Sequence, residues 1–416
     1  MKDKTKTLVV IGGGAAGFFC AINAARLNSN LKVIIIEKNN KLLSKVKVSG
    51  GGRCNVTHNC FDIVELSKKY PRGEQFLKKA FHWFNTKDTI SWFNERGIEL
   101  KTEADGRMFP VTNSSQTIID CLLDEATKYK VEILLSKDVK EIKKQDDLFE
   151  INFQNSDKKI TTNFVCVACG GFPKSSQFDW LTSLGHTIEN PVPSLFTFNI
   201  PNNNITKLMG LSVEQATVKI AGTKLQSQGP LLITHWGLSG PGVLKLSAFA
   251  ARELANKNYE FEALVNWLPK FNEQSFKEEI NVLRQKFSSQ KICSKNPFGL
   301  PNRLWEYFLT IAEINKNMRW ADLPTKQQNQ LVRSITAQSF LVKGKTTFKE
   351  EFVTCGGIKL NEVDVNTMQS KNANNLFFAG EILDIDGVTG GFNFQNAWTT
   401  GWIAAKAITK NPQENS

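Results

Sequence analysis

Residues 7–37 carry the pattern with the clearest chemistry. Gly12, Gly14 and Gly17 follow a short apolar run without a spacer. In a dinucleotide-binding turn, the first glycine permits the tight turn and the second lets backbone approach a pyrophosphate. The third lets the next helix pack against the strand, and the helix N-terminus, here Ala15 and Ala16, offers free N–H groups and a positive dipole end. The spacing predicts a dinucleotide site.

Glu37 completes this pattern. It ends a second apolar strand twenty residues after Gly17, where an acid can accept hydrogen bonds from a ribose diol. Glycines alone are weak evidence, but strand, turn, helix, strand and acid in this order are specific. Ala, Phe, Ile and Leu residues recur at helical spacing and predict a helix over 15–27.

A second glycine run follows the second strand. Gly51 and Gly52, followed by Arg53, Cys54 and Asn55, cannot lie inside a helix or strand. Backbone N–H groups there could bind an anion or the edge of a ring, and Arg53 could pair with a phosphate. A flexible surface loop is the alternative. The position just past a parallel strand favours a cofactor contact.

Two later stretches repeat the combination of strand end and glycine. The run over 164–171 is a strand that ends in Ala168, Cys169 and a pair of glycines, Gly170 and Gly171, which allows backbone to pass close to a cofactor. Gly380 and Glu381 follow an apolar run, and the glycine loop 390–395 precedes a helix expected over 396–408. A second helix N-terminus would then point at the same ligand.

The intervening pattern indicates an α/β protein with insertions. We expect helices over 61–69, 73–96 and 114–129, and a third parallel strand over 131–135. Three antiparallel strands are expected over 139–143, 148–153 and 159–162. The predicted domains are a nucleotide-binding domain over 1–190 and 361–416, an inserted β-domain over 191–270 with a return over 336–360, and a helical subdomain over 271–335.

Composition narrows the function classes. The 416 residues are 41% hydrophobic and 22% charged, as in ordinary globular proteins, and contain no apolar run that predicts a membrane span. The charged N-terminus lacks the apolar core of a signal peptide, so a cytoplasmic protein is expected. Only Cys166 and Cys169 form a C-x-x-C pair, for which buried packing is favoured over zinc or redox use. The four histidines do not cluster, and no metal site is predicted.

The net charge of +12 is concentrated. Residues 191–345 hold 19 Lys and Arg against 10 Asp and Glu, or +9. Such an excess can indicate nucleic acid, an acidic cofactor or only a solvated surface. Because the basic excess is concentrated in one segment, a polyanionic partner is a serious explanation. The alternative is that the chain is simply rich in lysine.

These motifs together resemble the YhiN/BaiN-like flavoproteins, also called aminoacetone oxidase family FAD-binding enzymes. The resemblance covers nearly the whole chain, and its most specific motifs are 49–57, 234–241 and 380–401, with 106–110. It implies a glutathione-reductase-like Rossmann FAD domain with an inserted β-barrel-like domain and a helical subdomain. The chain departs from the family after Cys169, where the glycines of the family's glycine- and serine-rich loop are missing, so the approach of NAD(P)H is not carried over.

The resemblance implies FAD as cofactor and NAD(P)H as a possible electron donor. By this resemblance, Gly12, Gly14 and Gly17 hold the pyrophosphate, and Glu37 and Lys38 lie at the ribose and adenine end. Residues 51–55 line the flavin, 380 and 381 meet the ribityl and pyrophosphate region, and the 391–395 helix start lies near the isoalloxazine O2. A positive dipole there would stabilise anionic reduced flavin. The cofactor-binding residues so assigned are Gly12, Gly14, Ala15, Ala16, Gly17, Glu37, Lys38, Gly51, Gly52, Arg53, Cys54, Asn55, Val139, Ala168, Cys169, Gly170, Gly380, Glu381, Gly391, Phe392, Asn393 and Phe394.

No side chain stands out as a catalytic acid. His235 lies in a turn-rich motif of the inserted domain that could face the flavin, and Cys54 lies in the flavin loop. A buried, hydrogen-bonded histidine and an inert thiol are the alternatives, and they are favoured.

Family activities include amine oxidation, reduction of unsaturated 3-oxo-steroids, and reduction of a uridine in large-subunit ribosomal RNA to dihydrouridine. The basic segment favours the RNA substrate, because phosphate neutralisation supplies much of nucleic-acid affinity. We therefore expect NAD(P)H-linked hydride transfer to an activated C=C, with ribosomal RNA dihydrouridine synthase preferred. A small-molecule amine oxidase or enone reductase is the alternative, and a non-enzymatic FAD-containing RNA-binding or assembly protein is an alternative of another class. The sequence predicts no membrane partner and does not indicate an oligomeric state.

Overall fold

The protein forms two units. The computed structural model describes residues 5–154, 156–346 and 353–410. Unit 1 comprises Met1–Ser194 and Phe348–Ser416, and unit 2 comprises Leu195–Thr347. The nucleotide-binding fold is therefore interrupted by one insertion, as the change of sequence texture near residue 191 indicates.

A five-stranded parallel sheet is the centre of unit 1, in the order β20-β10-β1-β2-β6. Its strands are β1 (Thr7–Ile11), β2 (Lys32–Ile36), β6 (Glu132–Leu134), β10 (Phe164–Val167) and β20 (Leu376–Phe378). β1, β2, β10 and β20 are short, largely buried apolar runs, as expected for parallel strands covered on both faces, whereas the edge strand β6 is only partly buried. The predicted third parallel strand is confirmed as β6, and the two distant parts of the chain meet where β20 pairs with β10.

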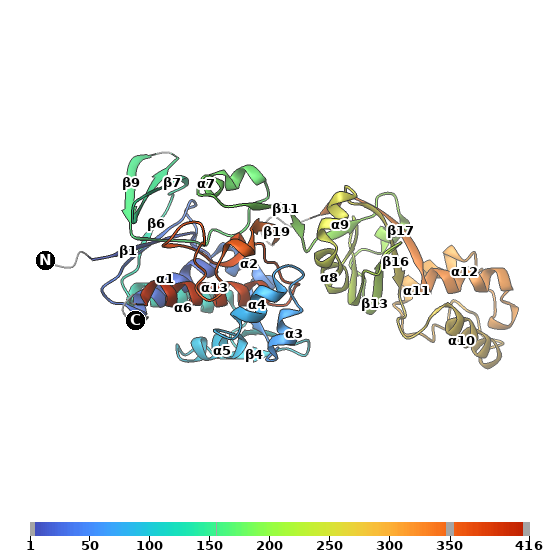
Figure 1. Ribbon diagram of the computed structural model, residues 1–416. Helices are drawn as coiled ribbons and strands as arrows, with labels where there is room; N and C mark the ends of the chain where they lie inside the picture. Colours follow the sequence, from blue (N-terminus) through green and yellow to red (C-terminus); the bar gives the residue numbers. More distant parts are fainter. Residues whose placement is uncertain (1–4, 155, 347–352, 411–416) are drawn as a thin grey trace. The chain divides into compact units, whose positions relative to one another are not determined.

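Helices α1 (Ala15–Leu27), α6 (Ser115–Lys128) and α13 (Phe392–Thr409) pack in this unit. Figure 1 shows α13, in red, beside α1, in blue. Phe19 of α1 lies 5.2 Å from Trp398 of α13 between ring centroids, and a side chain at Gly401 would meet the Ala16 carbonyl oxygen at 2.8 Å. The helix predicted over 15–27 is confirmed. The helix expected to begin near 396 begins at Phe392, because Gly391 adopts φ +91° and starts the helix directly.

The smaller helices of unit 1 differ from the sequence expectation in one place. They are α2 (Ser44–Gly52), α3 (Ile63–Ser67), α4 (Glu74–Ala80), α5 (Thr86–Asn94) and α7 (Asp179–Thr182), with 3-10 turns η1 (Ser175–Phe178), η4 (Leu360–Glu362) and η5 (Gly380–Ile382). The single helix predicted over 73–96 is wrong. The first part ends as α4 at Ala80, and Asn85 caps α5, since its side chain accepts from the Lys87 N–H while Asp88 accepts from the Asn85 N–H.

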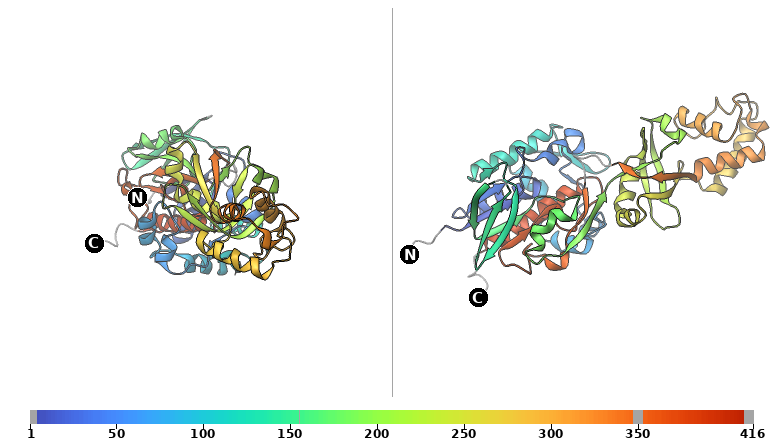
Figure 2. Two further views of the ribbon diagram at one scale, coloured as in Figure 1. Left: turned by 90° about the vertical axis from the view of Figure 1, so that its right-hand side faces the viewer. Right: turned by 90° about the horizontal axis from the view of Figure 1, so that it is seen from above.

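Three small antiparallel sheets complete unit 1. They are β7 (Val139–Gln145), β8 (Leu148–Phe153) and β9 (Ser156–Thr162); β3 (Thr57–His58), β5 (Arg107–Pro110) and β4 (Leu100–Thr102); and β11 (Ile188–Ser194) with β19 (Val353–Ile358). The first confirms the three strands predicted between 139 and 162, and Figure 2 shows them in teal to green. The pairing of β11 with β19 places 353–360 in unit 1, so their assignment to the β-domain is wrong.

Unit 2 has a seven-stranded sheet in the order β17-β16-β13-β14-β15-β12-β18. Its strands are β12 (Thr197–Asn199), β13 (Ser212–Ile220), β14 (Gln226–Ile233), β15 (Gly237–Ser239), β16 (Glu260–Asn266), β17 (Gln338–Lys343) and β18 (Lys345–Thr346). The order is that of an open sheet among the described residues, so the expected barrel is not closed. Its helices are α8 (Pro241–Phe249), α9 (Ala251–Asn256), α10 (Glu273–Lys286), α11 (Asn302–Ile311) and α12 (Thr325–Thr336), with η2 (Asn204–Leu208) and η3 (Trp320–Asp322).

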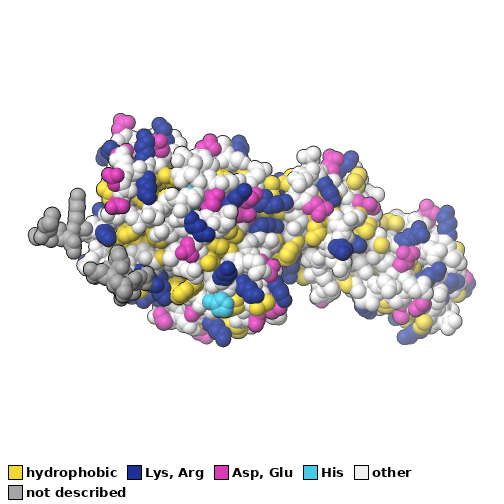
Figure 3. Space-filling model, in the orientation of Figure 1, with side chains coloured by type: hydrophobic (Ala, Val, Ile, Leu, Met, Phe, Trp, Pro, Cys, Tyr) yellow, Lys and Arg dark blue, Asp and Glu magenta, His cyan; other side chains and the backbone are white. Residues whose placement is uncertain are grey.

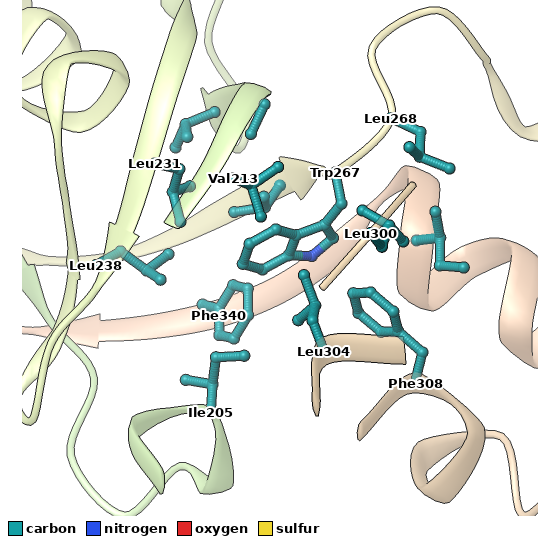
Figure 4. Close-up of a cluster of buried hydrophobic side chains, with 14 of the residues drawn as sticks. Ile205, Val213, Leu231, Leu238, Trp267, Leu268, Leu300, Leu304, Phe308 and Phe340 are labelled. Carbon is teal, nitrogen blue, oxygen red and sulfur yellow. The ribbon is translucent and has the colours of Figure 1, made fainter. Parts of the chain in front are cut away.

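One core joins the sheet and the helices of unit 2. Trp267 is fully buried between Phe340 of β17 and the α11 residues Leu304 and Phe308 (Figure 4). Its Nε1–H donates to Gln338 Oε1 at 2.8 Å, which satisfies the one polar atom of the indole. The helical segment is therefore packed on the sheet of unit 2 rather than forming a separate core.

Unit 1 also contains a buried polar network around His186. The Nδ1 of its ring lies 3.0 Å from Glu362 Oε2, and Nε2 lies 2.9 Å from Ser370 Oγ. Because Ser370 Oγ also accepts from two backbone N–H groups, its own hydrogen donates to Nε2, and the neutral ring donates from Nδ1. Burial lowers the pKa of His186, and Glu362 opposes this shift.

His186→Gln should lower the free energy of unfolding by about 1–3 kcal/mol at pH 7.5, because Glu362 and Ser370 lose a partner. Since the folded pKa lies below the unfolded value near 6.5, the wild type loses stability as pH falls below that value. The variant lacks this loss, so its deficit should narrow by pH 5. Urea unfolding at both pH values measures this, with exposed His82→Gln as control. A deficit that is equal at both pH values would contradict the neutral, buried ring.

Among the described residues, no helix is both long and apolar enough to cross a membrane.

Candidate cofactor site

The first glycine turn has the geometry that its spacing predicts. Gly12 adopts φ +115°, and a side chain there would lie 2.5 Å from the Ala168 carbonyl oxygen. A side chain at Gly17 would collide with the Gly12 carbonyl oxygen. At Gly14, the N-cap of α1, an added Cβ would meet no heavy atom within 4 Å. The start of α1 therefore faces open space, with the N–H groups of its first turn available to an anion.

Glu37 lies at the end of β2 beside this turn. Its Oε2 accepts the Gly13 N–H at 2.8 Å, and its Oε1 accepts two N–H groups of Asn39. A carboxylate has about four acceptor positions, so room for one more donor is left and the ribose contact stays a prediction. Lys38 is exposed, with its Nζ 5.5 Å from the centre of the Phe172 ring. Val139 begins β7, two residues after Lys137, whose N–H donates to the Glu37 carbonyl.

The second glycine run leaves helical geometry, as the sequence indicates. Gly50, Gly51 and Gly52 have φ of +59°, +69° and +83°, and side chains at Gly51 and Gly52 would meet nothing within 4 Å. Three consecutive residues in this conformation favour glycine strongly. This backbone is therefore accessible to a ligand on its open side.

Arg53 forms an ion pair within the protein. Its Nη1 lies 2.5 Å from Glu103 Oε1, and its guanidinium lies 4.1 Å from the centre of the Phe109 ring. The structure thus gives the charge of Arg53 a carboxylate partner from a distant segment, and its contact with a phosphate stays a prediction.

The start of α13 is tied to the same glycine run. In the amide orientation that satisfies both neighbours, Asn55 donates to the Thr57 carbonyl at 3.0 Å and accepts the Gly391 N–H at 2.9 Å. Buried Gln395 accepts from Thr57 Oγ1 at 2.6 Å. The N-terminus of the last helix therefore lies beside the loop that follows the first two strands.

The residues of the first turn of α13 have defined neighbours. Phe392 is buried, its carbonyl accepts from Tyr70 Oη at 2.7 Å, and its ring lies 4.7 Å from that of His58. Asn393 bonds to both the N–H and the carbonyl of Gly387. The half-buried ring of Phe394 lies parallel to Trp398 at 5.8 Å.

Sequence reasoning missed Lys45. Its Nζ lies 2.8 Å from Glu381 Oε2, while Glu381 Oε1 accepts the Thr354 N–H at 2.8 Å. Thr354 is fully buried, and its Oγ1 has no partner in the described part of the chain. A side chain at Gly171 would lie 2.5 Å from that Oγ1 and 3.1 Å from Glu381. Since Lys45 and Glu381 are 336 residues apart, no local pattern could have paired them.

The end of β10 supplies a third open backbone segment. Ala168 is buried, its N–H donating to the Ile11 carbonyl, whereas Cys169 is partly accessible. Gly170 adopts φ +77°, and an added Cβ would meet nothing within 4 Å. Cys166 is fully buried, as the predicted packing role requires, whereas Cys169 is half-buried.

This arrangement fits an extended dinucleotide. Backbone at Gly14, Gly51, Gly52 and Gly170 borders open space. The N-termini of α1 and α13 are both bonded to the chain that follows β2, because Leu43 N–H donates to the Gly13 carbonyl and Gly391 N–H donates to Asn55. A cradle of backbone N–H groups is suited to a pyrophosphate and to ring edges. No group of three or more His, Cys, Asp or Glu within the described ranges could hold a metal ion.

Comparison with known proteins agrees with the geometry. Residues 6–407 match the family described as HI0933-like protein Rossmann domain. The chain belongs to the HI0933-like family. This confirms the resemblance that the motifs indicate over nearly the whole chain.

Two curated relatives of this HI0933-like protein cover its length. One is a "3-dehydro-bile acid delta(4,6)-reductase" of Clostridium scindens, 26% identical over 97% of this chain and 99% of the relative. Another is a "Ribosomal RNA dihydrouridine synthase" of Escherichia coli, 29% identical over 96% of this chain and 97% of the relative. Among solved structures, 3-ketosteroid-Δ4-(5α)-dehydrogenase of Rhodococcus jostii is similar in fold, with TM-score 0.50, 12% identity and coverage of 99% and 98%.

The HI0933-like protein is an FAD-dependent oxidoreductase, as its family and relatives indicate.

The two catalytic candidates differ in accessibility. Cys54 has no accessible surface, and burial raises the pKa of its thiol to about 12, which favours the inert thiol of the two alternatives. His235 is exposed in the turn between β14 and β15 of unit 2, so the buried alternative is wrong; its catalytic role stays a prediction.

Proposed function

We propose that this HI0933-like protein reduces an activated C=C bond of uridine in ribosomal RNA, using NAD(P)H as electron donor. Bound FAD would supply the two-electron transfer between that donor and the C=C bond. Overall, NAD(P)H and one proton are consumed and the saturated C–C bond is formed. Both curated relatives bear names that describe such an outcome, a delta(4,6)-reductase and a dihydrouridine synthase.

The residues around the site have assigned tasks in this proposal. The first turn of α1 would bind the pyrophosphate through backbone N–H groups at and beyond Gly14. The first turn of α13 would direct its positive dipole end toward the negative charge that reduction creates. Lys45, paired with Glu381, would supply a cation beside the Gly380 turn.

The choice of RNA over a small molecule depends on one observation. Residues 191–345 carry 19 Lys and Arg against 10 Asp and Glu. A polyanion explains such an excess, because each neutralised phosphate contributes to binding. A bile-acid or other enone substrate is the second candidate. The similarity to the reductase of Clostridium scindens favours it.

Deletion of the gene should abolish one dihydrouridine of large-subunit ribosomal RNA, and a plasmid copy should restore it. Nucleoside mass spectrometry of purified ribosomal RNA measures this. Unchanged dihydrouridine would reject the RNA substrate. Anaerobic bleaching of the protein-bound flavin near 450 nm by NADPH or NADH tests the donor separately. If neither nicotinamide bleaches it, NAD(P)H is rejected as the electron donor.

A further inference from the structure

The C-terminal end of α10 and the loop after it form a surface with an unusual charge distribution. No Asp or Glu occurs between Glu279 and Glu306, a stretch of the chain that contains five cations. They are Arg284, Lys286, Lys291, Lys295 and Arg303. We propose that the face of unit 2 formed by Lys286, Lys291, Lys295, Lys316 and Arg319, here called the basic surface, binds the phosphates of RNA. This inference depends on the proposed RNA substrate.

The lysines of the basic surface are brought together by packing. Lys286 and Lys295 both lie over the half-buried ring of Phe287, with Nζ atoms 5.5 Å and 4.9 Å from its centre. Lys291 pairs with Arg319 in an antiparallel bridge, and its Nζ lies 2.8 Å from Asn317 Oδ1. The carbonyl of Lys316 accepts from Cys293 Sγ. Residues 286–295 and 316–319, which are distant in sequence, thus place their cations side by side.

The loop that carries these lysines is anchored to the core. Ile292 N–H donates to the Met318 carbonyl and Trp320 N–H to the Gln290 carbonyl, both at 3.0 Å. Trp305 and Trp320 are buried beneath, and Trp305 Nε1 donates to the Ile292 carbonyl at 3.1 Å. A surface held in this way loses little conformational entropy when it binds a ligand.

The charges of the basic surface are largely uncompensated. Within the part of the chain that the structure describes, Lys286, Lys291, Lys295 and Lys316 form no ion pair, and the only paired cation is Arg319, with exposed Asp322 at 2.8 Å. All five cations are exposed. Figure 3 shows Lys and Arg side chains over this helical end of unit 2, with some acids among them.

Arg284 adds a recess next to the basic surface. Its Nη1 donates to Gln328 Oε1 at 3.0 Å and its Nη2 to the Ala321 carbonyl at 3.2 Å, so the guanidinium is held in place. With Asn281, Gln285 and Ala321 it lines a hollow of about 400 Å³. Exposed lysines, a fixed guanidinium and an aromatic ring between cations are the groups that phosphates and unstacked bases prefer.

The test uses the full-length FAD-loaded protein and a fluorescent transcript of large-subunit ribosomal RNA. The variant is K286Q/K291Q/K295Q. The control is K140Q/K144Q/K158Q, which removes the same charge from exposed lysines of β7 and β9 in unit 1. Binding is measured by anisotropy over a range of KCl concentrations. Flavin absorbance and anaerobic reduction by NAD(P)H are measured without RNA.

If the three lysines contact phosphates, the slope of log K against log salt should become shallower by about 2, and affinity near 0.1 M salt should fall roughly a hundredfold. Flavin reduction should not change, and the control should stay within about threefold of wild type. Equal weakening in the control would overturn the proposal, since net charge alone would then be responsible. Binding to anionic phosphatidylserine vesicles but not to RNA would also overturn it, in favour of a membrane partner.

The failure of this inference is distinguishable from failure of the proposed function. If the deletion strain loses its dihydrouridine while the triple variant binds RNA like wild type, the function stands and the basic surface is rejected. If dihydrouridine is unchanged in the deletion strain, the RNA substrate is rejected, and the basic surface is rejected with it.

Discussion

Replacement of Gly14 by glutamate is expected to give a colourless, folded protein. Gly14 has φ −96°, which any residue can adopt, and an added Cβ would meet nothing within 4 Å, so the backbone should tolerate the change. The new carboxylate, however, would fill the open space at the start of α1. There it would compete with the pyrophosphate for the N–H groups of the first turn and repel its charge. The expected loss of the 450 nm absorbance is complete.

Leu27→Glu is the matched control, because it puts the same side chain into the last turn of the same helix at an exposed position. It should cost no more than about 1 kcal/mol of stability and retain the yellow colour. Circular dichroism and the cofactor-to-protein absorbance ratio are measured on both purified variants. A yellow Gly14→Glu protein would show that the pyrophosphate binds elsewhere.

The parts of the site predicted from sequence are those where local chemistry dictates local structure. Gly12 and Gly17 have no room for a side chain, so their spacing already contains the contact between turn, helix and strand. The break in the helix expected over 73–96 also has a local signal in the sequence, since Asn85 and Asp88 form a capping box and stand three residues apart. That error came from giving apolar periodicity more weight than the cap.

The contacts that could not be predicted join segments far apart in the chain. Arg53 pairs with Glu103, fifty residues away, and a charge run says nothing about which carboxylate will be near. The same holds for β11 and β19, whose pairing moves the unit boundary and whose strands each have little local signal. Long-range pairing is set by the whole fold, so the edge of an inserted unit is less predictable than its existence.

Arg72→Met should destabilise unit 1 strongly. The carboxylate of Asp386 is fully buried. It accepts hydrogen bonds from Arg72 Nε–H at 2.5 Å, from Arg72 Nη2–H, and from Ser194 Oγ–H at 2.6 Å. Removal of the guanidinium leaves a buried carboxylate without its counter-charge, which costs about 3–5 kcal/mol in unfolding free energy. Urea unfolding at pH 7 measures the loss. Arg319→Met is the control, since it breaks an exposed pair with Asp322 that contributes at most about 1 kcal/mol.

The pH dependence separates this electrostatic cause from lost packing. Burial raises the pKa of Asp386 above its ordinary value, and Arg72 and Ser194 oppose this shift. Without Arg72 the opposition weakens, so the folded carboxyl should take up a proton at higher pH than the unfolded one. A folded state that binds more protons gains stability as pH falls, and the deficit of Arg72→Met relative to wild type should therefore shrink between pH 7 and 5. A loss of packing alone would give a deficit that does not change with pH. Arg72→Met combined with Asp386→Asn removes both charges and should recover part of the stability at pH 7, because a neutral amide costs less to bury than an unpaired carboxylate.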